Sequence, residues 1–438
     1  MNKKISIGLA IALALIAMTV TFSITFVMSQ REFTVTMNSV REREKMYDKL
    51  AEIDKYVRDT YYGEINDNTL FDMLSAGYIL GTGDRNATYY TAEQYAELLE
   101  IQEGRIIGIG VEIMKDASSG GYARVTRVYT GSPAEEVGLQ KGDLITRIDD
   151  TEVRGLTKDA VDARLRGEEG TTVTLSCINS ENVTRDGLQV QRRRFDATTV
   201  DFQLLDSGYG YIKINTFNNS TPSDFDGALR QLMDRGAKGL VLDVRGNTGG
   251  LLSAAVKCVD LLAPEGTVAQ ARYKDGTQES MGESDENMVD LPMAVLVNNQ
   301  TASSAELFAA SLREFGKAQL VGTTTTGKWT IQDEPHRLSD GSAVSVTIAE
   351  LLTGGGESYN GTGLTPDVEA SLKAEEEQLG GMLDPAVDSV VQRAVSLLST
   401  GSADQGASSQ PSSEPASQPS SEPSSQPASE PASTSAAE

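Results

Sequence analysis

The chain has 438 residues, which is enough for roughly two or three domains with cores of their own. Its 38 basic and 63 acidic side chains give a net charge of −25, which disfavours nucleic acid as a partner. One histidine and two cysteines form no cluster with metal-ligand spacing, so we expect no metal site. Cys177 and Cys258 are expected to be small buried residues, and a single disulfide between them is the open alternative.

The N-terminal segment indicates the compartment. Asn2-Lys3-Lys4 precedes an uncharged run from Ile5 to Met28, which is long enough to cross a bilayer as a helix. The lysines favour an inside N-terminus, although Arg31 and later arginines weaken this bias. The run is longer than the apolar core of a cleaved signal peptide. We therefore expect residues 1–30 to be an uncleaved signal anchor, single-pass in the plasma membrane, with the rest of the chain extracytoplasmic.

Residues 31–105 carry a helical pattern, in which apolar side chains recur every three or four positions. We expect these apolar faces to pack within the chain, and a dedicated dimerisation helix, giving a homodimer, is the alternative. The apolar positions are Met46, Leu50, Ile53 and Val57 in one stretch, and Leu70, Met73, Leu74 and Tyr78 in the next.

Short strands follow in residues 106–190. Ile107–Ile113 alternates apolar and small residues, Ala123–Val128 alternates again, and Thr172–Ile178 reads as a closing strand. The glycines at the start of this region would by themselves fit a strand with no ligand. Together with Gly131-Ser132-Pro133-Ala134 and Gly142-Asp143, however, the region closely resembles a PDZ domain.

The PDZ resemblance implies a site for the end of a peptide chain. Backbone N–H groups would hold the terminal carboxylate, while the adjacent strand pairs with the peptide by β-augmentation. The residues at these positions are Ile107, Gly108, Ile109 and Gly110.

Strands and helices alternate in residues 191–396, which favours an α/β domain. We expect strands over Gly208–Ile214 and Lys238–Val244, with a helix from Ser223, capped by Ser-Asp, between them. The second strand ends in Arg245–Gly250, and a helix from Leu251 to Leu262 follows. This turn exposes N–H groups that can bind phosphate or an acyl-transfer oxyanion, but it matches no nucleotide-binding motif.

Ser303 lies between an expected strand, Met293–Val297, and an expected helix, Ser304–Phe315. Ser303 and Glu306 fit a capping box, in which the serine only satisfies the helix N-terminus. A catalytic interpretation uses the same position, since the positive end of the helix dipole favours the negative charge that develops in acyl transfer.

Lys328 also has two interpretations. Gly322–Lys328 matches the start of a phosphate-binding loop, but Trp329 follows where serine or threonine is needed, and Thr330–Gln332 looks extended. A buried, neutral lysine can instead act as a general base. In an extended segment Gln332, four residues later, would lie on the same face as Lys328 and could orient its amine. The lone His336 is expected near the surface on a β-ribbon with a turn at Asp340-Gly341, so a lysine base is the natural alternative to a histidine triad.

The segment Val297–Gln332, with Leu242–Gly250 upstream and Gly363–Asp367 downstream, resembles the C-terminal processing (tail-specific) peptidases. These are membrane-anchored or exported serine endopeptidases with a PDZ domain that senses substrate tails. The resemblance implies an α/β (α+β) multidomain protein, with a core of the ClpP/crotonase-like type and an added β-ribbon. It implies no cofactor, and protein or peptide partners with exposed C-termini. A non-catalytic, membrane-anchored PDZ adaptor is the alternative.

The same resemblance assigns roles residue by residue. It implies Ser303 as nucleophile, Lys328 as general base and Gln332 as the residue that orients the lysine. The N–H groups of Ser304 and Gly250 would form the oxyanion hole. Two departures stand out, because Ser304 replaces the usual alanine and Trp329 replaces the usual glycine.

The C-terminal residues 397–438 are of low complexity, with a proline at every fourth position from 411 to 431. Such a segment buries little apolar surface, so we expect a disordered tail that is either a solvated extension or a spacer.

Overall fold

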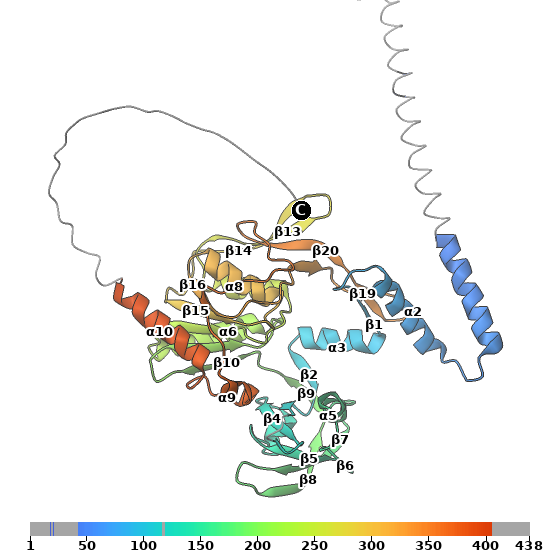
Figure 1. Ribbon diagram of the computed structural model, residues 1–438, viewed down its shortest axis with the longest axis horizontal. Helices are drawn as coiled ribbons and strands as arrows, with labels where there is room; N and C mark the ends of the chain where they lie inside the picture. Colours follow the sequence, from blue (N-terminus) through green and yellow to red (C-terminus); the bar gives the residue numbers. More distant parts are fainter. Residues whose placement is uncertain (1–17, 19–20, 22–42, 116–118, 405–438) are drawn as a thin grey trace, which may run out of the picture. The chain divides into compact units, whose positions relative to one another are not determined.

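The computed structural model describes residues 18, 21, 43–115 and 119–404 (Figure 1). Nearly all of the expected signal anchor lies outside the described residues. The expectation of a disordered tail from residue 397 is wrong at its start, because residues 397–404 continue the helix α10 (Ser389–Asp404), and the rest of the tail lies outside the described residues. Within the described ranges, no helix is both long and apolar enough to cross a membrane.

The described residues form two compact units, divided between Gly83 and Asp84. In the first unit, residues 43–60 are helical and α2 spans Asp67–Gly81, as the apolar spacing predicts. The apolar faces do not pack as expected, because Ile53 is 50% exposed and Met73 is 67% exposed. Only Ile79 is buried in α2. The expected packing of these faces is therefore not found among the described residues of this unit.

The second unit begins with β1 (Thr88–Tyr90) and α3 (Ala92–Gln102). β1 pairs with β19 (Ala343–Ser345), which pairs in turn with β18 (His336–Arg337). His336 is exposed on this antiparallel ribbon, as predicted.

The PDZ region contains a six-stranded sheet with the order β3-β4-β5-β7-β8, in which β6 also pairs with β5. β2 pairs separately with β9. The single strand expected over Ile107–Ile113 is therefore two strands in two sheets. Gly110 separates them at φ 82°, where an added Cβ would lie 2.1 Å from the Cβ of Ser132. The elements are β2 (Arg105–Gly108), β3 (Val111–Met114), β4 (Ala123–Val128), α4 (Pro133–Glu136), β5 (Leu144–Ile148), β6 (Thr151–Glu152), α5 (Lys158–Leu165), β7 (Thr172–Ile178), β8 (Thr184–Gln191) and β9 (Arg193–Asp196).

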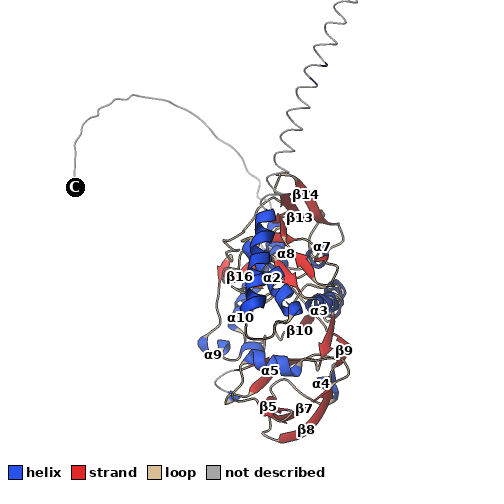
Figure 2. Ribbon diagram, turned by 90° about the vertical axis from the view of Figure 1, so that its right-hand side faces the viewer, coloured by secondary structure: helices blue, strands red, loops and turns tan. Residues whose placement is uncertain are grey.

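A six-stranded sheet with the order β10-β11-β12-β15-β16-β21 forms the core of the third region. β10 is antiparallel to β11, and the other pairs are parallel. Helices α6, α7 and α8 pack on one face and α10 on the other, which confirms the predicted α/β character (Figures 1 and 2). The elements are β10 (Val200–Leu204), β11 (Gly210–Ile214), α6 (Thr221–Asp234), β12 (Leu240–Asp243), α7 (Leu252–Asp260), β15 (Met293–Val297), α8 (Ser304–Glu314), β16 (Ala318–Gly322), β21 (Val368–Glu369), α9 (Ala374–Glu377) and α10 (Ser389–Asp404).

A second sheet has the order β14-β13-β20-β17, and its last strand, β17, begins two residues after Lys328. Its strands are β13 (Gly266–Tyr273), β14 (Gln278–Ser284), β17 (Thr330–Gln332) and β20 (Thr347–Thr353). The extended conformation predicted for residues 330–332 is confirmed, and no helix follows Lys328, which excludes a phosphate-binding loop.

The start of helix α6 differs from the prediction, whereas the two cysteines are as predicted. Helix α6 begins at Thr221 rather than at Ser223, because the side chain of Asn218 accepts the N–H groups of Ser220 and Thr221 and so starts the turn earlier. Cys177 and Cys258 are buried and free, which confirms the expected thiols. Burial raises the pKa of the Cys177 thiol to about 12, so this thiol stays protonated and unreactive near neutral pH.

A buried ion-pair network joins the end of β12 to the start of α10. Arg245 lies 2.6 Å from the carboxylate of Asp243 and 2.8 Å from that of Asp388. Burial by itself raises the pKa of Asp243, but Arg245 outweighs this effect and lowers the pKa to about 2. The ionised carboxylate therefore stabilises the fold above pH 4, and this contribution is lost as the pH falls toward 2.

Arg245→Ala should lower the free energy of unfolding by about 3–5 kcal/mol, because it leaves two buried carboxylates unpaired. Urea unfolding at neutral pH measures the change. Arg230→Ala is the matched control, since its pair with Asp226 is exposed and should contribute less than about 1 kcal/mol. Equal effects of the two substitutions would contradict a stabilising role for the buried network.

Candidate active site

Ser303 has an unusual backbone conformation, with φ 56° and ψ −124°. In the described ranges only Asp149 and Asn182 share a positive φ among non-glycine residues, and these residue types tolerate it better than serine does. Ser303 sits on the sharp turn between β15 and α8. Strained conformations of this kind are concentrated at functional sites, and a serine on a sharp strand-to-helix turn is a common nucleophile arrangement.

The predicted capping box of Ser303 and Glu306 is present through the glutamate, not through the serine hydroxyl. The Ser303 hydroxyl makes no cap hydrogen bond. Instead the backbone N–H of Ser303 donates to the Glu306 carboxylate at 2.9 Å. The hydroxyl is therefore not committed to the end of helix α8.

Glu306 is fully buried, and its carboxylate accepts hydrogen bonds from both the serine turn and the loop that carries Lys328. One oxygen accepts the N–H of Gly327 at 2.8 Å and the hydroxyl of Thr325. The other accepts the N–H of Ser303 and the N–H of Lys328, each at 2.9 Å. The serine turn and the lysine loop therefore converge on a single oxygen atom. The sequence marked Glu306 only as part of a capping box.

The glycine turn after β12 lies against the serine turn. A Cβ added to Gly249 would lie 2.9 Å from the Cβ of Ser303, so only glycine fits there. The N–H of Ala302 donates to the carbonyl of Asn247 at 3.0 Å, and the buried Asn247 side chain braces its own turn by accepting from the N–H of Gly249.

The N–H groups of Gly250 and Ser304 lie in these two touching turns. The carbonyl of Gly249 accepts the N–H of Phe217, and a trans peptide points the next N–H the opposite way. The N–H of Gly250 therefore faces away from Phe217. The N–H of Ser304 begins helix α8, where no carbonyl of the preceding turn can accept it. Both N–H groups are therefore candidate oxyanion donors.

Lys328 is half-buried, and burial lowers the pKa of its amine, with the charge of Asp84 opposing this shift. The neighbouring Trp329 is fully buried and packs with its ring centroid 5.1 Å from that of Tyr359. Trp329 therefore belongs to the core, and it contributes to the apolar surroundings of the lysine segment. A lysine with a lowered pKa is neutral more often, as a general base must be.

Gln332 lies on β17, but its amide donates to the hydroxyl of Thr330 at 2.8 Å and to that of Thr347 at 3.4 Å. Thr330 also accepts from the Asn86 side chain at 2.9 Å, and the Asp84 carboxylate accepts the N–H of Thr347 at 2.8 Å. The segment at the start of the second unit thus supplies polar groups to the lysine strand. Sequence reasoning missed Asp84 and Asn86, whose partners lie far along the chain.

The predicted PDZ residues Ile107, Gly108, Ile109 and Gly110 lie apart from this cluster, where β2 ends and β3 begins. Ile109 is buried, and its carbonyl accepts the N–H of Ala134 at 2.8 Å. β3 is an edge strand of its sheet. An edge strand has backbone groups available for pairing, which is the requirement for β-augmentation.

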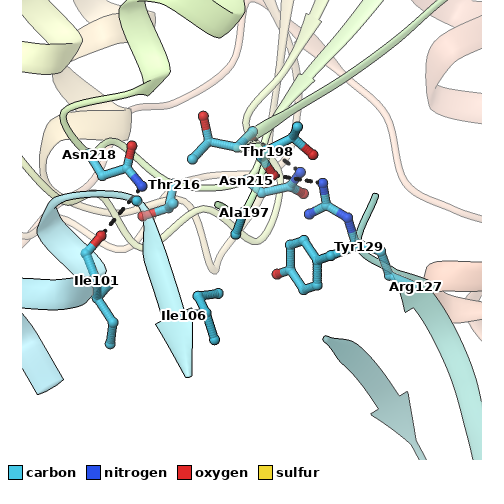
Figure 3. A pocket seen from close by; sticks show the side chains of 11 residues that line it. Ile101, Ile106, Arg127, Tyr129, Ala197, Thr198, Asn215, Thr216 and Asn218 are labelled. Atoms are coloured by element: carbon cyan, nitrogen blue, oxygen red, sulfur yellow. Dashed lines mark hydrogen bonds between the residues drawn. The ribbon is translucent and has the colours of Figure 1, made fainter. Parts of the chain in front are cut away.

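A pocket of about 60 Å³ lies where the chain enters and leaves the PDZ region (Figure 3). On one wall the side chain of Asn218 donates to the carbonyl of Ile101, and on another Arg127 lies over the ring of Tyr129. Arg127 also donates to the Thr198 carbonyl and the Asp201 carboxylate, each at 2.9 Å, and so links β4 to β10. None of the predicted site residues lines this pocket.

The fold and these residues define a serine protease core joined to a PDZ domain. Residues 208–370 match peptidase family S41, and residues 124–179 match the PDZ domain. The carboxy-terminal processing protease CtpA of Bacillus subtilis is 32% identical over 361 residues, covering 82% of this chain and 76% of that protein. The carboxyl-terminal-processing protease of Synechocystis is 35% identical over 323 residues, covering 72% and 74%.

The chain belongs to the carboxy-terminal processing proteases of peptidase family S41, and it is a serine protease. A solved structure from Bacteroides fragilis has a TM-score of 0.50 at 21% identity, covering 67% of this chain and 83% of that one. This likeness shows the fold alone. The non-catalytic adaptor suggested as an alternative is not supported by these findings.

Proposed function

We propose that this protease cleaves protein substrates with a serine–lysine dyad, in which Ser303 is the nucleophile and Lys328 the general base. One observation carries the proposal: the backbone N–H groups of both residues donate to the same oxygen of Glu306 at 2.9 Å. A strained serine turn and a lysine with a lowered pKa are thus brought together without a histidine.

The chemistry follows from the properties of these groups. The neutral amine of Lys328 takes the proton of the Ser303 hydroxyl as its oxygen attacks the substrate carbonyl. The N–H groups of Gly250 and Ser304 stabilise the oxyanion, and the lysine ammonium then protonates the leaving amine. Water hydrolyses the acyl-enzyme by the same route in reverse. Gln332 would orient the amine once its own amide turns from Thr330 toward Lys328.

We assign the PDZ domain to the recognition of substrate C-termini. The support is the open edge of β3 beside the loop of Ile107, Gly108, Ile109 and Gly110. The names of the two relatives describe processing at the carboxyl terminus, which agrees with this assignment. The proposed substrates are therefore proteins or peptides with exposed C-termini.

We infer from the uncharged Ile5–Met28 run that residues 1–30 anchor the chain in the plasma membrane, with the catalytic part outside the cytoplasm. The exposed apolar faces of the helix over residues 43–60 and of α2 support a homodimer.

A fluorophosphonate probe tests the dyad. We expect mass spectrometry to find the label on Ser303. The labelling rate should rise with pH through the pKa of Lys328, since the base acts only when neutral, and this pKa lies below its ordinary value because the amine is partly buried. Label on Ser304, or a rate that is flat with pH and unchanged in Lys328→Ala, would contradict the proposal.

A further inference from the structure

We propose that Ser304 is a positioning residue, whose hydroxyl fixes the oxyanion hole by binding the carbonyl of Gly250. The proposal rests on the assignment of the N–H groups of Ser304 and Gly250 as oxyanion donors. It explains the hydroxyl of Ser304, which stands where the family resemblance leads us to expect alanine.

The hydroxyl of Ser304 is already engaged. Its Oγ donates to the Gly250 carbonyl at 2.9 Å, and the residue is only 2% exposed. A buried hydroxyl whose proton is bound to a backbone carbonyl is poorly placed to attack a substrate. The second serine of the pair therefore does not compete with Ser303 as the nucleophile.

The bond joins the segments that carry both donors. Ser304 supplies one donor from its own N–H at the start of α8, and its side chain holds the residue that supplies the other. The side chain of Ser304 therefore fixes the distance between the N–H groups of Ser304 and Gly250. A preorganised oxyanion hole stabilises charge without reorganising during the reaction. The bond therefore lowers the free energy of the transition state and contributes little to substrate binding.

The bond from Ser304 completes the hydrogen bonding around Gly250. Its φ of 130° is a conformation that only glycine adopts readily, and an added Cβ would lie 2.1 Å from the Phe217 carbonyl oxygen. The preceding carbonyl of Gly249 accepts the N–H of Phe217 at 3.0 Å, and the following N–H of Leu251 donates to the Phe217 carbonyl at 2.7 Å. The hydroxyl of Ser304 secures the remaining carbonyl, so the N–H of Gly250 is the group left for a substrate.

Ser304→Ala tests the inference, because it keeps the backbone donor of residue 304 and removes only the bond to Gly250. We expect kcat to fall about tenfold, less than the loss of a whole oxyanion donor, while KM stays within about twofold. The Ki of a peptide boronic acid, which mimics the tetrahedral intermediate, should rise by the same factor as kcat falls. Ser304→Thr, which retains a hydroxyl, should restore both values.

Ser311→Ala is the matched control. Ser311 lies in the same helix, is equally buried, and donates to the carbonyl of Val268 at 3.2 Å, on a strand that supplies no oxyanion donor. The control should keep wild-type kcat and Ki. Equal losses in the two alanine variants would overturn the inference, since they would report helix stability alone.

Two other outcomes separate this inference from the proposed function. Wild-type kcat and Ki in Ser304→Ala, with Ser303→Ala inactive, would overturn the positioning role and leave the dyad intact. If the fluorophosphonate labelled Ser304 in the wild-type protein, and Ser304→Ala were both unlabelled and inactive, Ser304 would be the nucleophile. That result would overturn both the positioning role and the proposed dyad.

Discussion

Ser303→Ala should lower kcat by roughly 10⁴- to 10⁶-fold, because the variant keeps the base and the oxyanion donors but has no nucleophile. The fold should persist. The Ser303 hydroxyl makes no cap hydrogen bond, and the N–H that Glu306 accepts remains in alanine. Cleavage of a substrate with a defined C-terminal tail measures the loss, and circular dichroism checks the fold.

The inactive protein should still bind substrate, so it can serve as a trap. Partners recovered with Ser303→Ala, and the sequences of their C-termini, would identify the tails that the PDZ domain accepts. Ser280→Ala, at an exposed position in β14, is the control and should cleave normally. Cleavage by Ser303→Ala at the wild-type rate would place the nucleophile elsewhere.

The elements around Ser303 could be predicted from local sequence because each is encoded locally. The apolar run before Arg245, the glycines at 249 and 250, and the serine at the helix start predict strand, turn and helix in order, and the structure confirms them. The PDZ strands were less well predicted. The alternation over Ile107–Ile113 runs through Gly110, but the contact with Ser132 that forces the break is not visible in local spacing.

The contacts that assemble the site could not be predicted in the same way. Asn86 binds Thr330 across 244 positions of sequence, and nothing near Asn86 indicates that partner. Glu306 looked like an ordinary capping residue, because its second role depends on the loop that carries Gly327 and Lys328 folding back onto it. Local patterns specify elements, whereas the site depends on how those elements meet.

Glu306→Gln should be the most damaging change that leaves both dyad side chains in place. The carboxylate accepts four hydrogen bonds, and an amide would turn a donor toward N–H groups that need an acceptor. Hydrogen bonds to a buried charge are worth about 1.5–3 kcal/mol each, so we expect about 2–5 kcal/mol less free energy of unfolding. We also expect kcat to fall at least about 100-fold, because the turn of Ser303 and the loop of Lys328 lose their common anchor.

Glu376→Gln separates the two effects. Glu376 is also largely buried and accepts from Ser389 and from the N–H of Lys373, but it lies at α9, away from the serine turn. It should lose stability while keeping kcat at a temperature where both variants are folded. Urea unfolding and steady-state kinetics on the same preparations decide the matter. If Glu306→Gln lost only stability, like Glu376→Gln, then Glu306 would support the fold without positioning the dyad, since a misplaced base or nucleophile lowers kcat in a protein that is fully folded.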